Sequence, residues 1–184
     1  APPNLVQATP TLYTSGQPPA KSLEGLKAQG FEAVVYLAPT TVGDAVPGEA
    51  RIVGGETDIR LSLAGRTMKV DAGGANIPGG EFFGCPVEDS AEGTIAFTEF
   101  PAVYQGREYT GIRLRFEGGR VVDASADTNE ADLIDVLDGD EGARRLGELG
   151  IGCNPGITQY MRNTLFDEKI DGTVHLALGN GLPD

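Results

Sequence analysis

The feature that most constrains the fold is a segment in which apolar and polar residues alternate on both sides of a Gly-Gly turn. Residues 112–116 read Ile-Arg-Leu-Arg-Phe, Glu-Gly-Gly follows, and residues 120–125 read Arg-Val-Val-Asp-Ala-Ser. Alternation with period two puts the apolar side chains on one face of a strand, and paired glycines accept the positive φ angles of a tight turn. The sequence therefore predicts a β-hairpin, with Arg113 and Arg115 on its solvated face, at the centre of a mainly antiparallel sheet.

Further strands and two helices are predicted around this hairpin. A capping box formed by Asp127 and Glu130 favours a helix at 130–137, and the spacing of Ala143, Leu146 and Leu149 favours a second helix at 140–150. The remaining strands are predicted at 58–63, 68–70 and 93–97. Strands followed by two helices and another strand indicate the α+β class, with an antiparallel or mixed sheet.

The N-terminal part predicts a small strand–helix–strand unit. Residues 12–14 favour a short strand, residues 20–29 a helix that ends before Gly30, and residues 31–37 a buried strand. Residues 39–56 are rich in Gly and Pro and predict a loop or linker.

The charge balance excludes two classes of partner. The net charge is −13, and Lys and Arg form no basic run, which argues against binding to nucleic acid or to anionic membranes. No apolar run approaches the roughly 20 residues that cross a bilayer.

The single histidine of the chain, His175, lies in a segment with strand periodicity. In residues 172–179, Val174, Leu176 and Leu178 alternate with Thr173, His175 and Ala177. A strand here turns its aliphatic side chains to one face and the imidazole to the other. A polar histidine at a sheet surface is the commoner interpretation, and a functional one requires acidic partners within reach.

Three glutamates have notable local contexts. Glu81 lies between a Pro-Gly-Gly turn and Phe82, Glu148 lies near the end of the predicted helix 140–150, and Glu168 follows Asp167. A carboxylate at the C-terminal end of a helix is unfavourable unless a cation compensates it. Each glutamate alone is more simply a surface residue, and local spacing does not join them.

A resemblance to a known family does join them. The chain contains, in order, Pro-Gly-Gly-Glu at 78–81, Pro-Val-Glu-Asp-Ser at 86–90, Leu-Gly-Glu at 146–148, Asn-Thr-Leu-Phe-Asp-Glu at 163–168 and His-Leu-Ala-Leu-Gly at 175–179. From about residue 55 to residue 183 it resembles the thermophilic metallo-aminopeptidases, the aminopeptidase T group.

The resemblance implies hydrolysis of N-terminal residues from peptides with two divalent ions, zinc, cobalt or manganese. It implies the metal ligands Glu81, Glu148, Glu168 and His175, with Glu148 as a bridging carboxylate. Two such ions activate water, polarise the scissile carbonyl and hold the free amine of the substrate. The resemblance also suggests a cytoplasmic homodimer.

The sequence departs from this family in one important respect. The family continues into a His-x-Asp pair that completes the site, whereas this chain ends at Asp184. The sequence therefore predicts a metallo-aminopeptidase-like domain, residues 55–184, with impaired activity and a site for one ion or two. The alternative is a non-catalytic, chimeric or designed fold with at most a weak divalent-ion site.

The first 54 residues carry a second resemblance, to the N-terminal part of small tyrosine/dual-specificity-phosphatase-like proteins. It rests on Leu-Tyr-Thr-Ser-Gly-Gln-Pro at 12–18 and Gly-Phe-Glu-Ala-Val-Val-Tyr-Leu-Ala-Pro at 30–39. Phosphatase chemistry needs a cysteine with an arginine six positions later, but Ala91 follows Cys85 and Gln159 follows Cys153 at that spacing. We therefore expect a fragment without phosphatase activity, with both cysteines as small buried apolar residues. A leaderless start of this kind also suggests an exported origin.

Overall fold

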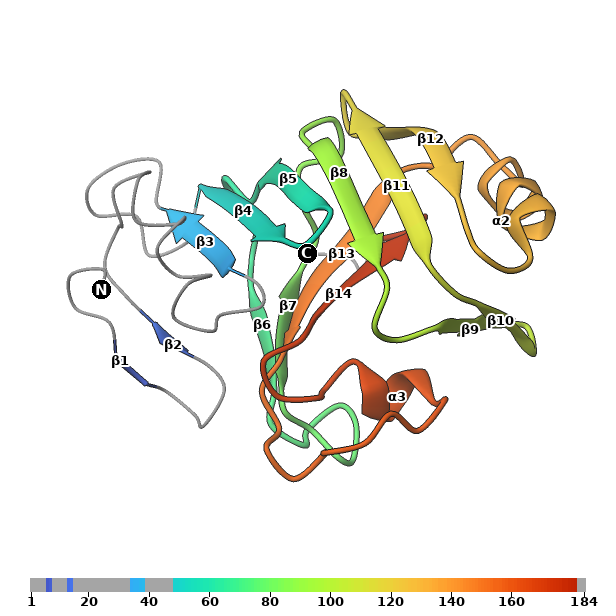
Figure 1. Ribbon diagram of the computed structural model, residues 1–184. Coiled ribbons are helices and arrows are strands. Elements are labelled where there is room, and N and C mark those ends of the chain that lie inside the picture. The colour runs from blue at the N-terminus through green and yellow to red at the C-terminus, as the bar shows by residue number, and fades with distance from the viewer. Residues whose placement is uncertain (1–5, 8–12, 15–33, 39–47, 182–184) are drawn as a thin grey trace.

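Two sheets carry most of the structure. The computed structural model describes residues 6–7, 13–14, 34–38 and 48–181, and its described part contains two helices (Figure 1). The strands are β1 (Val6–Gln7), β2 (Tyr13–Thr14), β3 (Val34–Ala38), β4 (Glu49–Gly54), β5 (Thr57–Ser62), β6 (Lys69–Asp71), β7 (Glu81–Gly84), β8 (Glu92–Phe97), β9 (Ala102–Tyr104), β10 (Arg107–Tyr109), β11 (Ile112–Glu117), β12 (Arg120–Ser125), β13 (Leu146–Gly152) and β14 (Val174–Leu178). The helices are α2 (Glu130–Leu137) and α3 (Thr164–Asp167). The predicted α+β class, with mainly antiparallel sheets, is confirmed.

The larger sheet has six antiparallel strands in the order β12-β11-β8-β5-β4-β3. The predicted hairpin forms as β11 and β12, but its expected central position is wrong, because β12 is an edge strand. The chain leaves β12 for α2, and the following segment covers the edge, where the Val121 N–H donates to the Arg144 carbonyl at 2.9 Å.

The smaller sheet has four antiparallel strands in the order β14-β13-β7-β6 and lies across the larger one (Figure 1). One core cluster joins the two sheets. Ile59, Leu61 and Phe116 from the larger sheet are buried in it with Leu149 from the smaller sheet. Val174, Leu176 and Leu178 of β14 pack against the same cluster. The predicted alternation in β14 therefore places its aliphatic face on the core.

The helix at 130–137 is confirmed, but its predicted capping box is wrong. The N-cap is Asn129, with φ 56° and no side-chain cap bond. Asp127 is not available as a cap, because its carboxylate accepts from Arg113 at 3.2 Å. The Glu130 side chain instead reaches back to the Ala126 N–H at 3.2 Å.

The helix predicted at 140–150 is wrong, because Leu146–Gly152 form the strand β13. Residues 146, 147 and 149–152 are buried in β13, which pairs with β7 and β14 on its two edges. A strand buried on both faces has no clear period of two, so its leucines fitted a helical spacing by chance. Glu148 therefore lies on a strand, and the predicted unfavourable helix dipole does not act on it.

The N-terminal predictions are only partly within the described residues. Strands form at 13–14 and 34–38, whereas the predicted helix 20–29 lies outside the described residues. The predicted loop 39–56 is wrong at 49–54, which form β4. Gly54 ends β4, and Gly55 and Glu56 form the turn to β5. Because β4 pairs with both β3 and β5, the strands before and after residue 54 share one sheet. No helix in the described part of the chain is long and apolar enough to cross a membrane.

Candidate metal centre

The face of the smaller sheet that turns away from the core carries the polar residues of the candidate site. In the register of the sheet, Gly150 pairs with His175 and Gly152 pairs with Glu81. Alternation along β13 places Glu148 on the same face as these two glycines. Three strands thus bring Glu81, Glu148 and His175 to one surface, opposite the aliphatic residues of β14.

The imidazole of His175 lies between two carboxylates. Its Nε2 atom is 3.3 Å from Glu81 Oε2 and 3.3 Å from Glu148 Oε1. Glu81 is almost sealed from solvent, with 5% of its side chain exposed, whereas Glu148 is 19% exposed. The group therefore has a buried end at Glu81 and a more open end at Glu148.

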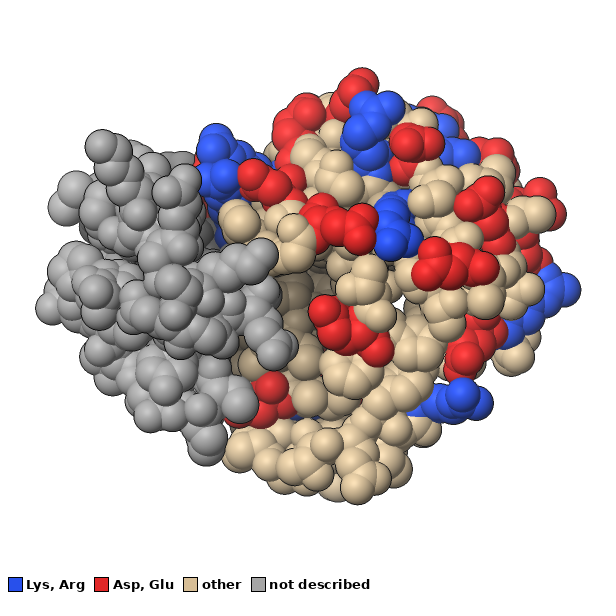
Figure 2. Space-filling view, viewed as in Figure 1, with Lys and Arg blue, Asp and Glu red and all other residues tan. Residues whose placement is uncertain are grey.

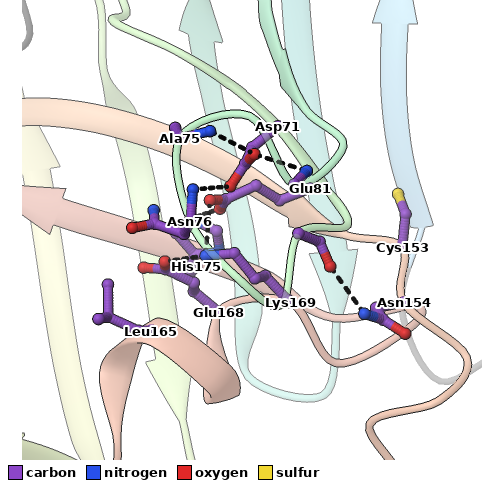
Figure 3. Close-up of polar contacts among 12 residues, drawn as sticks. Asp71, Ala75, Asn76, Glu81, Cys153, Asn154, Leu165, Glu168, Lys169 and His175 are labelled. Carbon is purple, nitrogen blue, oxygen red and sulfur yellow. Dashed lines mark hydrogen bonds and ion pairs between the residues drawn. The ribbon is translucent and has the colours of Figure 1, made fainter.

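The end of α3 adds a third carboxylate and an ammonium group. Glu168 is the C-cap of α3, and one of its oxygens, an oxygen of Glu81 and a nitrogen of His175 all lie within 4.8 Å of one another. Lys169 follows, with its Nζ atom 3.0 Å from Glu81 Oε1 and in a short ion pair with Glu168 Oε1 (Figure 3). Burial alone would lower the pKa of Lys169, but its bonds to Glu168 and Glu81 outweigh burial and raise that pKa.

The glycine at position 150 makes room for the imidazole. A Cβ atom at Gly150 would lie 1.9 Å from Nε2 of His175, closer than any two such atoms can approach. A residue with a side chain fits here only if the imidazole shifts. The packing of β13 against β14 therefore fixes where the His175 ring lies.

Several ligand-type atoms in this group have no hydrogen-bond partner. They are Glu81 Oε2 and both ring nitrogens of His175, all three buried. Burial raises the pKa of Glu81, with the Glu168 charge acting in the same direction and Lys169 and His175 opposing it. Buried polar atoms without partners are costly. Atoms that converge without bonding to one another are what a cation site requires.

A loop next to β7 is fixed by another buried acid, Asp71. Its Oδ1 atom accepts the N–H groups of residues 73–75 at 2.9–3.1 Å, and its Oδ2 atom accepts the Asn76 N–H at 3.1 Å. Burial alone would raise the pKa of Asp71, but the N–H donors of Ala75, Gly73 and Asn76 outweigh it and lower that pKa. Asp71 pairs with Glu81 across β6 and β7, so this loop forms one wall of the site.

The two cysteines are not among the candidate ligands, although Cys153 lines the same cavity as Glu81 and Asp71. Neither forms a disulfide, and both are half-buried rather than buried as predicted. Cys153 lines a cavity of about 380 Å³ together with Met68, Val70 and Phe82. Burial raises the pKa of the Cys153 thiol, so this sulfur is not activated as a nucleophile.

All four residues predicted as metal ligands lie together, although they are far apart in sequence. Their role as ligands stays a prediction. Sequence reasoning missed Lys169 and Asp71. Lys169 follows Glu168 directly, and nothing in the neighbouring sequence indicates that it is buried. Asp71 precedes Ala-Gly-Gly-Ala-Asn, a sequence typical of a loop capped by an acidic side chain, and that signal could have been found.

Comparison with known proteins places this site in a family context. Residues 50–184 match the model of the family described as thermophilic metalloprotease, M29. Aminopeptidase 2 of Geobacillus stearothermophilus is 40% identical over 112 residues, which cover 59% of this chain and 26% of that protein. Aminopeptidase T of Thermus thermophilus is 34% identical over 160 residues, which cover 84% of this chain and 36% of that protein.

A solved structure is also similar. Wild-type AmpT from Thermus thermophilus matches with a TM-score of 0.63 and 28% identity, covering 88% of this chain and 39% of that one. The matches to Aminopeptidase T and to AmpT cover 84% and 88% of this chain, which is more than residues 55–184 alone amount to. The similarity therefore begins before Gly54. The chain spans about a quarter to two fifths of the length of these relatives.

Proposed function

Because this chain belongs to the M29 family of thermophilic metalloproteases, we propose that it is a metallo-aminopeptidase domain with a divalent-cation site. The ligands are Glu81, Glu148, Glu168 and His175. The observation that carries the proposal is the convergence of Glu81 Oε2 and the imidazole of His175, which lie 3.3 Å apart without hydrogen-bond partners.

The chemistry of these side chains fits a divalent transition metal. One imidazole nitrogen and three carboxylates are ligands that zinc, cobalt and manganese accept in proteins. With neutral His175, the three carboxylates and the Lys169 ammonium leave two negative charges at the site. One divalent ion balances that charge. The identity of the metal, and whether a second ion binds, remain parts of the proposal.

The more open end of the site suits a peptide N-terminus. When bound, a divalent ion supplies Lewis acidity toward water and a peptide carbonyl. Glu148 and Glu168 are 19% and 15% exposed, so their carboxylates offer negative charge to the free ammonium of a peptide. Glu81 lies deeper and acts only as a ligand. The relatives named as aminopeptidases support this substrate class.

An assay of leucine p-nitroanilide hydrolysis tests the proposal. We expect slow hydrolysis that requires zinc, cobalt or manganese, stops with a chelator and is lost in Glu148→Gln. The exposed Glu141→Gln is the matched control, because it makes the same charge change away from the site, and it should leave the rate unchanged. Hydrolysis that survives both chelation and Glu148→Gln would contradict the proposal.

A second candidate is a non-catalytic domain with one weak divalent-ion site. It is favoured by Lys169, whose ammonium already pairs with two of the carboxylates. Ion binding without hydrolysis of any aminoacyl substrate would select it. A homodimer and a cytoplasmic location are likewise proposals that a sizing experiment and cell fractionation would test.

A further inference from the structure

Lys169 is the most deeply buried charge at the candidate metal centre. Its side chain is 0% exposed, and its ammonium bridges Glu81 and Glu168. Taking a charge out of water is expensive, and a buried ion pair repays this cost only with good geometry. A buried lysine is therefore weak evidence for added stability. The buried position of Lys169 therefore needs an explanation other than stability.

The backbone places this lysine firmly. The Lys169 N–H donates to the Phe166 carbonyl at 3.1 Å, and its carbonyl accepts the Asn154 N–H at 2.9 Å. The segment also packs directly on β13, where a Cβ at Gly152 would lie 2.1 Å from the Ile170 carbonyl oxygen. The ammonium thus extends from a fixed piece of backbone toward the sheet face that carries the site.

The ammonium uses one oxygen of each of two carboxylates. It binds Oε1 of Glu81 and Oε1 of Glu168. This leaves Glu81 Oε2 facing Nε2 of His175 at 3.3 Å, without a hydrogen bond. An ammonium group has only donors, so it cannot itself bind a metal ion. It can fix which oxygen of each carboxylate is free to do so.

We propose that Lys169 is a positioning residue of the metal centre, holding Glu81 and Glu168 so that their free oxygens face His175 and form the seat of a divalent cation. This inference rests on the proposed cation site. Partners that orient metal ligands from outside the coordination sphere commonly change metal affinity 10- to 100-fold when they are removed. A merely structural ion pair would change stability and leave affinity alone.

Calorimetric titration of the metal-stripped chain with Mn²⁺ and Zn²⁺ tests the role of Lys169. We expect Lys169→Met to weaken binding roughly 10- to 100-fold relative to the wild type. Lys69→Met is the matched control, because it removes the same charge from the same sheet at β6, and it should bind like the wild type. Melting curves of the metal-free proteins record any separate effect on stability.

Removing one partner of a buried ion pair can prevent folding, so Lys169→Arg is the second variant. It keeps the positive charge and the donors, and we expect affinity between those of the wild type and Lys169→Met. Unchanged or tighter binding in either Lys169 variant would overturn the positioning role, and tighter binding would identify the ammonium as a competitor of the metal. A wild-type chain that binds neither ion would overturn the cation site and this inference with it.

Discussion

The two main sheets share one apolar core but differ in what their outer faces carry. On the larger sheet, charged residues pair at the surface, as Arg51 does with Asp58 and Arg113 with Glu56. On the smaller sheet, Glu81 and Lys169 are paired but almost completely buried. Figure 2 shows mixed acidic and basic side chains over the upper right of the molecule, in the region of β8, β11 and β12.

This difference distinguishes the sheet that mainly stabilises the fold from the sheet that carries the candidate site. Surface ion pairs cost little and contribute little, because water solvates both partners. Buried charges cost much more, and packed apolar residues in their place are often as stable. A face that buries a carboxylate and an ammonium beside a half-buried imidazole is less stable than an apolar face would be, and such a face points to a ligand. The larger sheet supplies the stability that this site lacks.

Truncation in the core of the larger sheet should have the largest effect on stability. Phe116 is 1% exposed at the middle of the core, and Phe116→Ala should lower the free energy of unfolding by about 3–5 kcal/mol. Urea denaturation measures this loss. Val122→Ala, an exposed position on the neighbouring strand, should stay within about 0.5 kcal/mol of the wild type. If Phe116→Ala cost no more than this control, the larger sheet would not be the stabilising region.

A substitution that forces the imidazole to move should affect both stability and metal binding. At Gly150 a Cβ atom would overlap His175 Nε2, so Gly150→Ala should cost about 1–3 kcal/mol through overpacking. It should also weaken binding of Mn²⁺ in calorimetry. Gly74→Ala is the control, since a Cβ there meets nothing within 4 Å. If Gly150→Ala bound Mn²⁺ as tightly as the wild type, His175 would not be a ligand of the site.

The loop capped by Asp71 should make stability depend on pH in acid. The pKa of Asp71 is lowered from its ordinary value of 3.8, so the folded state favours the carboxylate. Its stabilisation is present above pH 3.8 and is lost as the pH falls through the lowered pKa. Asp71→Asn should therefore melt below the wild type at pH 7, with a smaller gap at pH 3. A gap that stayed constant or widened in acid would contradict this role.

The ion pair between β4 and β5 should have the smallest effect. Arg51 binds Asp58 through two bonds of 2.9 and 2.7 Å, but 56% of the Asp58 side chain is exposed. A double-mutant cycle with Arg51→Ala and Asp58→Ala should give a coupling energy of about 0.2–1 kcal/mol, reduced by added salt. A coupling of several kcal/mol would remove the contrast between the faces of the two sheets.

Strands with one solvated face were predictable from the sequence, and doubly buried segments were not. The hairpin β11–β12 and the strand β14 alternate clearly, because one face meets the core and the other meets polar groups. The strand β13 contains Gly147, Gly150 and Gly152, each in close contact with another part of the chain. These glycines are required by packing against residues that are distant in sequence, and no local pattern records such contacts. The spacing of the apolar residues in this segment therefore predicted a helix.

The candidate ligands were found through family resemblance rather than through spacing. Glu81, Glu148 and His175 come from three strands that only the sheet register brings together. The burial of Lys169 likewise arises from the packing of the α3 segment on Gly152. Long-range placement of this kind depends on the whole fold, which explains why the sequence alone left the site as separate residues.

Anomalous X-ray scattering from crystals soaked in Mn²⁺ or Zn²⁺ tests the central claim most directly. The cation site predicts a strong anomalous peak between the carboxylates of Glu81, Glu148 and Glu168 and Nε2 of His175, with Lys169 still bound to the other oxygens of Glu81 and Glu168. The peak should vanish in crystals of His175→Ala soaked in the same way. A metal-soaked crystal with no peak among these four side chains, or with peaks only at exposed surface carboxylates, would contradict it.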